Sequence, residues 1–247
     1  MSKSFLVDTS RCTACRGCQI ACKEWHELPA NKTKQRGSHQ NPPDLNPYNY
    51  RILRFSETLE NDKISWYFFP DQCRHCIDPP CKGEAEGYME GAVIQDAKTG
   101  AVVFTELTRK LSPEACESLR SACPYDIPRR DEKTGLMTKC DMCVDRVSNG
   151  MLPACVKVCP TGAMNFGERA DMLELAQKRL AEARKEYPNA TLADADSVNT
   201  IFLLVDEPGK YHTFAVAGLS RGLVDRKQFL TTLFGPLRRP IQRTIRT

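Results

Sequence analysis

Thirteen cysteines are the residues of this 247-residue chain with the most obvious capacity for chemistry. Four explanations compete for them: disulfides, zinc sites, iron–sulfur clusters, or unreactive buried thiols. Because the number is odd, a complete set of disulfides would leave one cysteine unpaired. The spacing of the cysteines along the chain therefore has to decide among these alternatives.

The first group forms a C-x2-C-x2-C-x3-C run, made up of Cys12, Cys15, Cys18 and Cys22. In bacterial ferredoxins the first three cysteines of such a run bind one [4Fe–4S] cluster and the fourth binds the other cluster. A short loop can surround three corners of a cubane, whereas the fourth residue already belongs to a helix that points elsewhere. A zinc site needs only two cysteines from each loop. Four cysteines within eleven residues therefore indicate an iron–sulfur protein.

The last group has the spacing C-x2-C-x11-C-x3-C and is followed by Pro160. If the fourth cysteines are exchanged as in ferredoxins, the first and last groups together hold two clusters. The predicted ligands of cluster 1 are Cys12, Cys15, Cys18 and Cys159. The predicted ligands of cluster 2 are Cys22, Cys140, Cys143 and Cys155. More than a hundred residues separate the two halves of this pair, so the chain between them must be an insertion.

The insertion repeats the pattern in incomplete form. The same exchange predicts one complete ligand set for cluster 3, made up of Cys73, Cys76, Cys81 and Cys123. A fourth cluster would need cysteines at positions 85, 113, 116 and 119, but three of these are Ala85, Pro113 and Leu119. Cys116 is left without partners, which accounts for the odd count, and we expect it to be a small buried apolar residue.

Short strands are predicted around the inner cysteines. Residues 50–55 and 64–69 look like two strands, and the polar stretch between them predicts a hairpin. Residues 92–94 and 101–104 predict a second, shorter pair of strands around a turn. Residues 27–50 contain four prolines and predict an irregular connection.

The last third of the chain contains no further cysteine. Apolar residues recur at helical spacing over 171–187, and Pro188 follows them, so we predict a helix there. A strand is predicted over 201–205. The stretch 237–247 is rich in arginine and is predicted to be a solvated or mobile tail.

Together these features predict an α+β fold with two ferredoxin-like, cluster-binding subdomains, one inserted in the other. The outer subdomain is predicted to comprise residues 1–50 and 132–168 and to hold two clusters. Residues 51–131 form the inserted inner subdomain, which holds one cluster and has lost the second. Residues 169–247 are predicted to form a C-terminal extension with a helix, a strand and the basic tail.

Composition and charge exclude several classes of function. The formal charge of +4 becomes about −2 once three clusters and their thiolates are counted, so no nucleic-acid partner is expected. No run of 18 apolar residues exists, and we expect no membrane span. Residues 1–5 lack the pattern of a signal peptide, so no export signal is expected in this chain. No residue set resembles a catalytic site, a phosphate-binding loop or a pterin site.

The cysteine motifs resemble those of a known family, the four-cluster β-subunits of molybdenum and tungsten bis-pterin oxidoreductases. The resemblance covers roughly residues 4–166 and rests on the run at 12–22, C-R-H-C-I-D-P-P-C at 73–81, A-C-P-Y at 122–125, and K-C-D-M-C at 139–143. Within that family the chain is most similar to formate dehydrogenase subunits of the soluble, two-subunit kind found in sulfate-reducing bacteria. That similarity rests on F-L-V-D-T-S-R at 5–11, W-H at 25–26 and P-G-K-Y-H at 208–212.

The resemblance implies a non-catalytic electron-transfer subunit. It would receive electrons from formate oxidation in a tungsten- or molybdenum-pterin catalytic subunit and pass them to an acceptor such as a c-type cytochrome. Membrane-bound relatives carry a fourth cluster and a C-terminal membrane helix; the lack of both here implies a soluble acceptor. Exported relatives imply a periplasmic location, reached by co-export with the catalytic subunit; otherwise the protein is cytoplasmic.

Two alternatives stay open. The chain could serve another molybdopterin oxidoreductase, of the polysulfide, thiosulfate or dimethyl sulfoxide reductase type, or it could be a zinc-stabilised binding module without redox function. His75 is expected to pack in its loop or donate a hydrogen bond instead of binding metal. Lys139 and Arg146 are interpreted as balancing cluster charge, contacting the large subunit, or simply being solvated. Trp25 and Trp66 are expected to be core or partner contacts.

Overall fold

The computed structural model describes residues 2–60 and 62–218 and shows a mixed α+β fold, as predicted. The predicted basic tail at 237–247 lies outside the described residues. One four-stranded sheet and three two-stranded sheets are present in the described part of the chain. No helix in this part is long and apolar enough to cross a bilayer.

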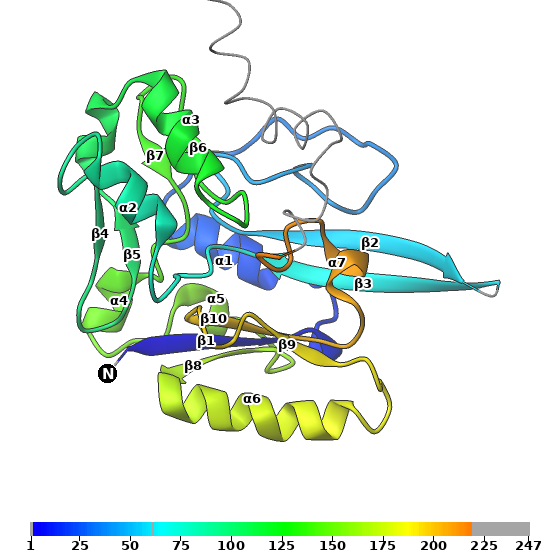
Figure 1. Ribbon diagram of the computed structural model, residues 1–247. Coiled ribbons are helices and arrows are strands. Elements are labelled where there is room, and N and C mark those ends of the chain that lie inside the picture. Colours follow the sequence, from blue (N-terminus) through cyan, green and yellow to red (C-terminus); the bar gives the residue numbers. More distant parts are fainter. Residues whose placement is uncertain (1, 61, 219–247) are drawn as a thin grey trace, which may run out of the picture.

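The four-stranded sheet joins the two ends of the described chain. Its order is β8-β1-β10-β9, with bounds β1 Lys3–Asp8, β8 Met164–Glu168, β9 Thr191–Ala193 and β10 Thr200–Leu204. β1 is parallel to β10, with Leu6 opposite Ile201, and antiparallel to β8. Helix α6, Arg169–Ala183, covers one face of the sheet, while the cysteine-bearing segments lie across the other (Figure 1).

Both faces of β1 and β10 are buried, so these strands are nearly continuous apolar runs. Leu6 and Ile201 pack toward α6, in one cluster with Leu180. Phe5 and Phe202 point the opposite way, into a cluster that also contains cysteines. The sheet is therefore the floor on which the outer cysteines are built.

The predicted helix and strand of the last third are confirmed with shifted ends. α6 begins at Arg169 and ends at Ala183, whereas the prediction extended to residue 187. The chain leaves the helix in a turn over 184–187 because a residue before proline avoids helical backbone angles. The strand predicted over 201–205 is β10.

A long hairpin, β2 (Ile52–Glu60) and β3 (Lys63–Asp71), extends from the body of the protein (Figure 1). The sequence predicts the hairpin but treats its polar middle as a connection. In the structure strand pairing continues through this stretch as far as Glu60 opposite Lys63. The polar side chains of residues 57–60 therefore lie on a paired strand of a projecting ribbon.

The remaining elements are short and flank the cysteines. The small strands are β4 Val93–Gln95, β5 Val102–Phe104, β6 Arg129–Arg130 and β7 Met137–Thr138. The helices are α1 Gly17–Trp25, α2 Pro80–Glu86, α3 Pro113–Ser121, α4 Val144–Ser148, α5 Ala154–Lys157 and α7 Pro208–Tyr211, with 3₁₀ turns at Thr9–Arg11 and Glu106–Lys110. The β4–β5 pair is the second predicted hairpin, and residues 27–50 contain no helix or strand, as predicted.

A buried ion-pair triad fixes the loop that follows the long hairpin. The Asp71 carboxylate, fully buried at the end of β3, accepts hydrogen bonds from Arg54 Nε at 2.7 Å and Arg74 Nη1 at 2.8 Å. The two guanidiniums hold the pKa of Asp71 below its usual range, although burial opposes this. Arg74 also lies over the Phe202 ring at 4.7 Å, so the triad ties the inner cysteine loop to the main sheet.

Candidate metal centres

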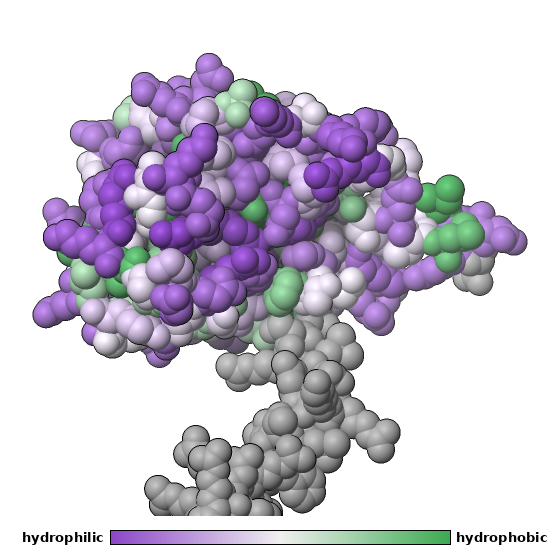
Figure 2. Space-filling model, turned by 90° about the horizontal axis from the view of Figure 1, so that it is seen from above, coloured by the Kyte–Doolittle hydropathy of each residue, from purple (hydrophilic) through white to green (hydrophobic). Residues whose placement is uncertain are grey.

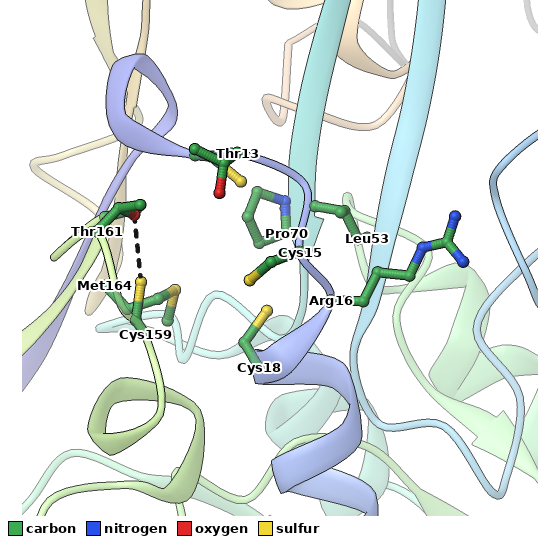
Figure 3. A pocket seen from close by; sticks show the side chains of 11 residues that line it. Thr13, Cys15, Arg16, Cys18, Leu53, Pro70, Cys159, Thr161 and Met164 are labelled. Carbon is green, nitrogen blue, oxygen red and sulfur yellow. Dashed lines mark hydrogen bonds between the residues drawn. The ribbon is translucent and has the colours of Figure 1, made fainter.

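Four of the predicted ligands surround one cavity at the edge of the main sheet. The lining of this cavity includes the group named here set 1: Cys12, Cys15, Cys18 and Cys159. Figure 3 shows the side chains of Cys15, Cys18 and Cys159 directed into the same space, whereas Arg16 points away from it. Leu53 and Pro70 of the long hairpin close the cavity on one side.

The Cys159 thiol has the most favourable environment for a thiolate in set 1. Against the effect of burial, the amides of Met164, Thr161 and Ala163 and the Thr161 hydroxyl lower the pKa of Cys159. The Thr161 hydroxyl lies 3.8 Å from the sulfur. In contrast, burial raises the pKa of Cys12 to about 11. A cationic metal core would supply the attraction that Cys12 lacks.

A second group of cysteines, named set 2, is fully buried. It consists of Cys22, Cys140, Cys143 and Cys155. Burial, followed by the proximity of Cys155 and Cys143, raises the pKa of Cys22 well above its ordinary value. Burial and then Cys22 have the same effect on Cys140. Four thiols that oppose one another's ionisation at such close range are the donor set expected for a metal core.

The inner cysteines form a third group, named set 3. They line a second cavity and are Cys73, Cys76, Cys81 and Cys123. Burial raises the pKa of the Cys76 thiol well above its ordinary value, and the other three thiols of the set add to this effect. The backbone amide of His75 donates a hydrogen bond to Cys73 Sγ at 3.3 Å.

The C-x-x-C loops that begin at Cys12, Cys73 and Cys140 share one local conformation. The residue before the second cysteine has a positive φ in each: 57° at Ala14, 46° at His75 and 67° at Met142. Non-glycine residues adopt this region only at a cost of roughly 1–2 kcal/mol. The same strained turn at three separate sites aims backbone amides and thiols inward, as anion-binding loops do. The three sets are therefore built alike.

The sets follow one another in space as 1, 2, 3. After the effect of burial, Cys18 of set 1 contributes to the raised pKa of Cys155 in set 2, and Cys73 of set 3 contributes to that of Cys140. Set 2 is buried at all four positions. Cys15 of set 1 is exposed, and Cys76 of set 3 is half-buried. The arrangement therefore has two ends that reach the surface and a middle that does not.

Two buried cations lie among the sets. Arg51 is only 1% exposed, and the thiolates of Cys155 and Cys18 raise its pKa although burial opposes this. Lys139 is 6% exposed, and Cys73 and then Cys81 raise its pKa against the same effect. A solvated side chain was one of the interpretations of Lys139 from sequence, and its burial rules that interpretation out. The sequence did not single out Arg51, because a lone arginine beside a strand carries no recognisable signal.

The positions of the missing fourth set are occupied by apolar packing. Ala85, Cys116 and Leu119 belong to one buried hydrophobic cluster, and Pro113 begins α3. Cys116 is buried, as predicted. A cavity of about 300 Å³ beside Cys116 has no second thiol in its lining and is bordered mainly by arginine and glutamate. This donor set does not fit a four-iron cluster.

The other conspicuous residues have structural roles. His75 is fully buried and accepts a hydrogen bond from the Val102 amide through Nδ1, and burial lowers its pKa well below the usual value. Arg146 is buried, not solvated, and stacks on Trp25 at 4.1 Å. Trp25 is partly exposed, and Trp66 is 60% exposed, so neither belongs to the core.

One further group of possible metal ligands occurs in the described residues. His26 Nε2 lies 3.4 Å from Asp141 Oδ1 and 3.8 Å from Cys143 Sγ. Because Cys143 already belongs to set 2, this group is part of the surroundings of that set. The W-H motif at 25–26 is thus explained by proximity to set 2.

Four thiolates suit either zinc or a [4Fe–4S] cluster, so the donor sets alone do not separate the two. Comparison with known proteins does. Residues 64–169 match the family model described as a 4Fe-4S dicluster domain. The chain is 60% identical over 216 residues to formate dehydrogenase 2 subunit beta (cytochrome c-553) of Nitratidesulfovibrio vulgaris, an alignment that covers 87% of this chain and 99% of the relative.

This chain belongs to the family of formate dehydrogenase beta subunits. A second relative, formate dehydrogenase subunit beta of Megalodesulfovibrio gigas, is 54% identical over 88% of this chain and all of its own length. The formate dehydrogenase-O iron-sulfur subunit of Escherichia coli is 39% identical over 84% of this chain and 69% of its own length. The protein is accordingly an iron–sulfur, electron-transfer subunit and not the catalytic one, as the motifs predict.

Because Cys123 is assigned to set 3 and Cys116 to no set, serine substitutions at these two positions should give different results. Cys123→Ser removes a thiol from set 3 and should lower the iron content from about twelve to about eight per chain. Cys116→Ser should leave it unchanged, because Cys116 packs among apolar side chains. Iron analysis and electron paramagnetic resonance measure both variants. Equal loss in the two would show that the inner cysteines are paired differently.

Proposed function

We propose that this beta subunit binds three [4Fe–4S] clusters, one on each cysteine set, and conducts electrons from one surface of the chain to another. The observation that supports this most strongly is the order of the sets. The middle set is buried at every position, and the two outer sets each bring a cysteine to the surface. A structural zinc protein has no need for such a continuous arrangement.

A bound cluster would supply one-electron chemistry, and the protein would set its potential through ligation, hydrogen bonds and burial. The chain contributes these in different measure at each set. Backbone amides act on Cys159 of set 1 and on Cys123 of set 3. Set 2 is the most deeply buried and therefore the site where an added electron is hardest to accommodate.

We infer that the sets are distributed over two ferredoxin-like subdomains, with residues 51–131 inserted between 1–50 and 132–168, and with 169–247 as an extension. Two helix pairs support the division, because α1 packs on α5 and α2 packs on α3. The first pair bears cysteines of sets 1 and 2, with Cys18 and Cys22 on α1 and Cys155 on α5. The second pair bears Cys81 on α2 and Cys116 on α3. The hairpin that opens the proposed insertion also packs against the cavity of set 1.

Electrons from formate oxidation, carried out in a catalytic subunit that holds a tungsten- or molybdenum-pterin, would enter at set 1. An apolar strip supports this choice. Leu59, Ile64 and Trp66 are 70%, 69% and 60% exposed and share one face of the hairpin with Leu53 and Pro70, which line the set 1 cavity. Figure 2 shows hydrophobic surface at the far end of this hairpin. Permanent subunit interfaces are typically apolar.

Electrons would leave from set 3 to an external acceptor, for which we propose a c-type cytochrome. The surface beside Cys76 has a small apolar centre, Ile77, which is 46% exposed and donates its amide to the Ser197 carbonyl at 2.9 Å. The exposed carboxylates of Asp78 and Asp196 flank it. Such a surface suits brief contact with a basic haem protein, since charge speeds the encounter. The name of the relative from N. vulgaris includes a cytochrome.

Removal of the cluster at set 3 should separate two activities of the complex. In Cys76→Ser, reduction of the cytochrome by formate should fall by at least about tenfold, equivalent to about 1.4 kcal/mol of barrier. Reduction of a small artificial dye should largely persist, because the dye can collect electrons from the sets before it.

Cys116→Ser is the matched control, since it replaces a cysteine of the same subdomain outside the three sets, and both of its activities should match the parent complex. If both activities of Cys76→Ser fall together, or neither falls, set 3 is not where electrons leave.

We further propose that the protein is periplasmic and is exported after folding, together with a catalytic subunit that carries the export signal. Fractionation of cells with and without the catalytic subunit tests this. The beta subunit should appear in the periplasm only when the catalytic subunit is present. Retention in the cytoplasm beside that subunit would contradict the proposal.

A further inference from the structure

Arg51 lies at the junction of sets 1 and 2. Its guanidinium is fully buried and donates from Nη2 to the Pro70 carbonyl at 3.2 Å and to Met164 Sδ at 3.1 Å. Nε and Nη1 have no hydrogen-bond partner among residues 2–60 and 62–218. The charges that act on it most strongly are the thiolates of Cys155 and Cys18, one from each set.

Lys139 occupies the corresponding position between sets 2 and 3. Its ammonium donates to the carbonyls of Val102 and, at 3.0 Å, Cys140, and lies 5.1 Å from the centre of the Phe104 ring. Cys73 and Cys81 of set 3 and Cys140 of set 2 act on it electrostatically. Asp141 also acts on it, and its Oδ1 atom lies 3.4 Å from His26 Nε2.

Neither cation forms an ion pair with a carboxylate within the described part of the chain. Three other buried arginines have their charges balanced by carboxylates, while Arg146 has no ion pair in that part of the chain and stacks on Trp25 away from the junctions between sets. Arg54 and Arg74 share Asp71, and Arg129 binds Asp44 and Asp126. A buried charge without a counter-charge is strongly unfavourable, so the thiolates of the three sets must be the partners of Arg51 and Lys139.

The buried set 2 explains why two such cations are needed. A four-iron cluster with its thiolates carries a charge of about −2, which becomes about −3 when the cluster is reduced. Burial disfavours the more highly charged state, so the middle of the relay would be the hardest part to reduce. A fixed positive charge on either side favours the added electron.

We propose that the positive charges of Arg51 and Lys139 raise the reduction potential of cluster 2, the buried middle cluster. Arg51 also acts on cluster 1, and Lys139 also acts on cluster 3. The inference rests on the proposed three-cluster relay. It assigns Arg51 to clusters 1 and 2 and Lys139 to clusters 2 and 3. Only cluster 2 is under the influence of both.

The test is a potentiometric titration of the complete complex, followed by electron paramagnetic resonance. Arg51→Gln should shift the reduction potentials of clusters 1 and 2 to more negative values and leave that of cluster 3 unchanged. The signal of cluster 3 is identified as the one that is absent from Cys123→Ser. Lys139→Gln should shift two potentials that include that of cluster 3. One potential should fall in both variants, and in the double variant it should fall by about the sum of the two shifts.

Charge-conserving and paired controls separate charge from shape. Arg51→Lys and Lys139→Arg should keep all potentials close to those of the parent. Arg129→Gln removes a buried arginine whose charge is already balanced by Asp44 and Asp126, and should shift none of them. Arg51→Met is a second neutral variant that better fills the space of the side chain.

The outcomes are distinct. Unchanged potentials in Gln variants that retain three clusters would overturn the inference and leave the relay intact. Fewer than three clusters in the parent chain would instead contradict the proposed function. If neither neutral Arg51 variant assembles its clusters but Arg51→Lys does, charge at this position is required and the inference stands. Shifts of equal size in Arg51→Lys and Arg51→Gln would show a role in shape alone and would overturn it.

Discussion

The burial of negative charge is the constraint on which this structure depends. Twelve thiols lie in three groups, and most of them are in an interior where ionisation is opposed by burial and by their neighbours. Without a cationic core such groups would stay protonated and would not hold the loops together. The strained turns, the inward amides and the two unpaired cations are all understandable as means of making this interior suitable for anionic clusters.

The rest of the architecture serves to place these groups in a line. The main sheet provides a floor that joins β1 near the start of the chain to β10 near residue 200, and the outer cysteines pack on one face of it. The Asp71 triad then links the inner loop to that floor. Where the fourth set would lie, Cys116 packs on one side against an apolar cluster and has no second thiol in the cavity beside it, so the line ends at set 3.

Cysteine spacing was sufficient to propose the membership of all three groups, because ferredoxin loops impose a fixed distance between ligands. Strand-like segments separated by polar or turn residues were sufficient for the hairpins and β10, and helical periodicity was sufficient for α6. The parallel pairing of β1 with β10 was not foreseen, since it joins segments almost two hundred residues apart and no local pattern encodes it. The length of the long hairpin was missed for a related reason, because polar residues on a projecting ribbon resemble a loop.

Arg51 and Lys139 illustrate the limit most clearly. In a sequence, a basic residue is most often solvated, and only packing of distant segments reveals that these two are enclosed among thiols. Arg51 comes from the start of the long hairpin, Lys139 precedes the last cysteine group, and their partners come from four other segments of the chain. Contacts of this kind cannot be found from cysteine spacing alone.

The most direct test is the metal content of the full chain purified without oxygen. Three [4Fe–4S] clusters on twelve of the thirteen cysteines require about twelve irons and about twelve acid-labile sulfides per chain, with the brown colour of four-iron clusters and no zinc. About sixteen irons would mean that a fourth cluster forms despite the apolar packing around Cys116. About eight irons, or zinc in stoichiometric amount, would contradict the assignment of one cluster to each of the three sets.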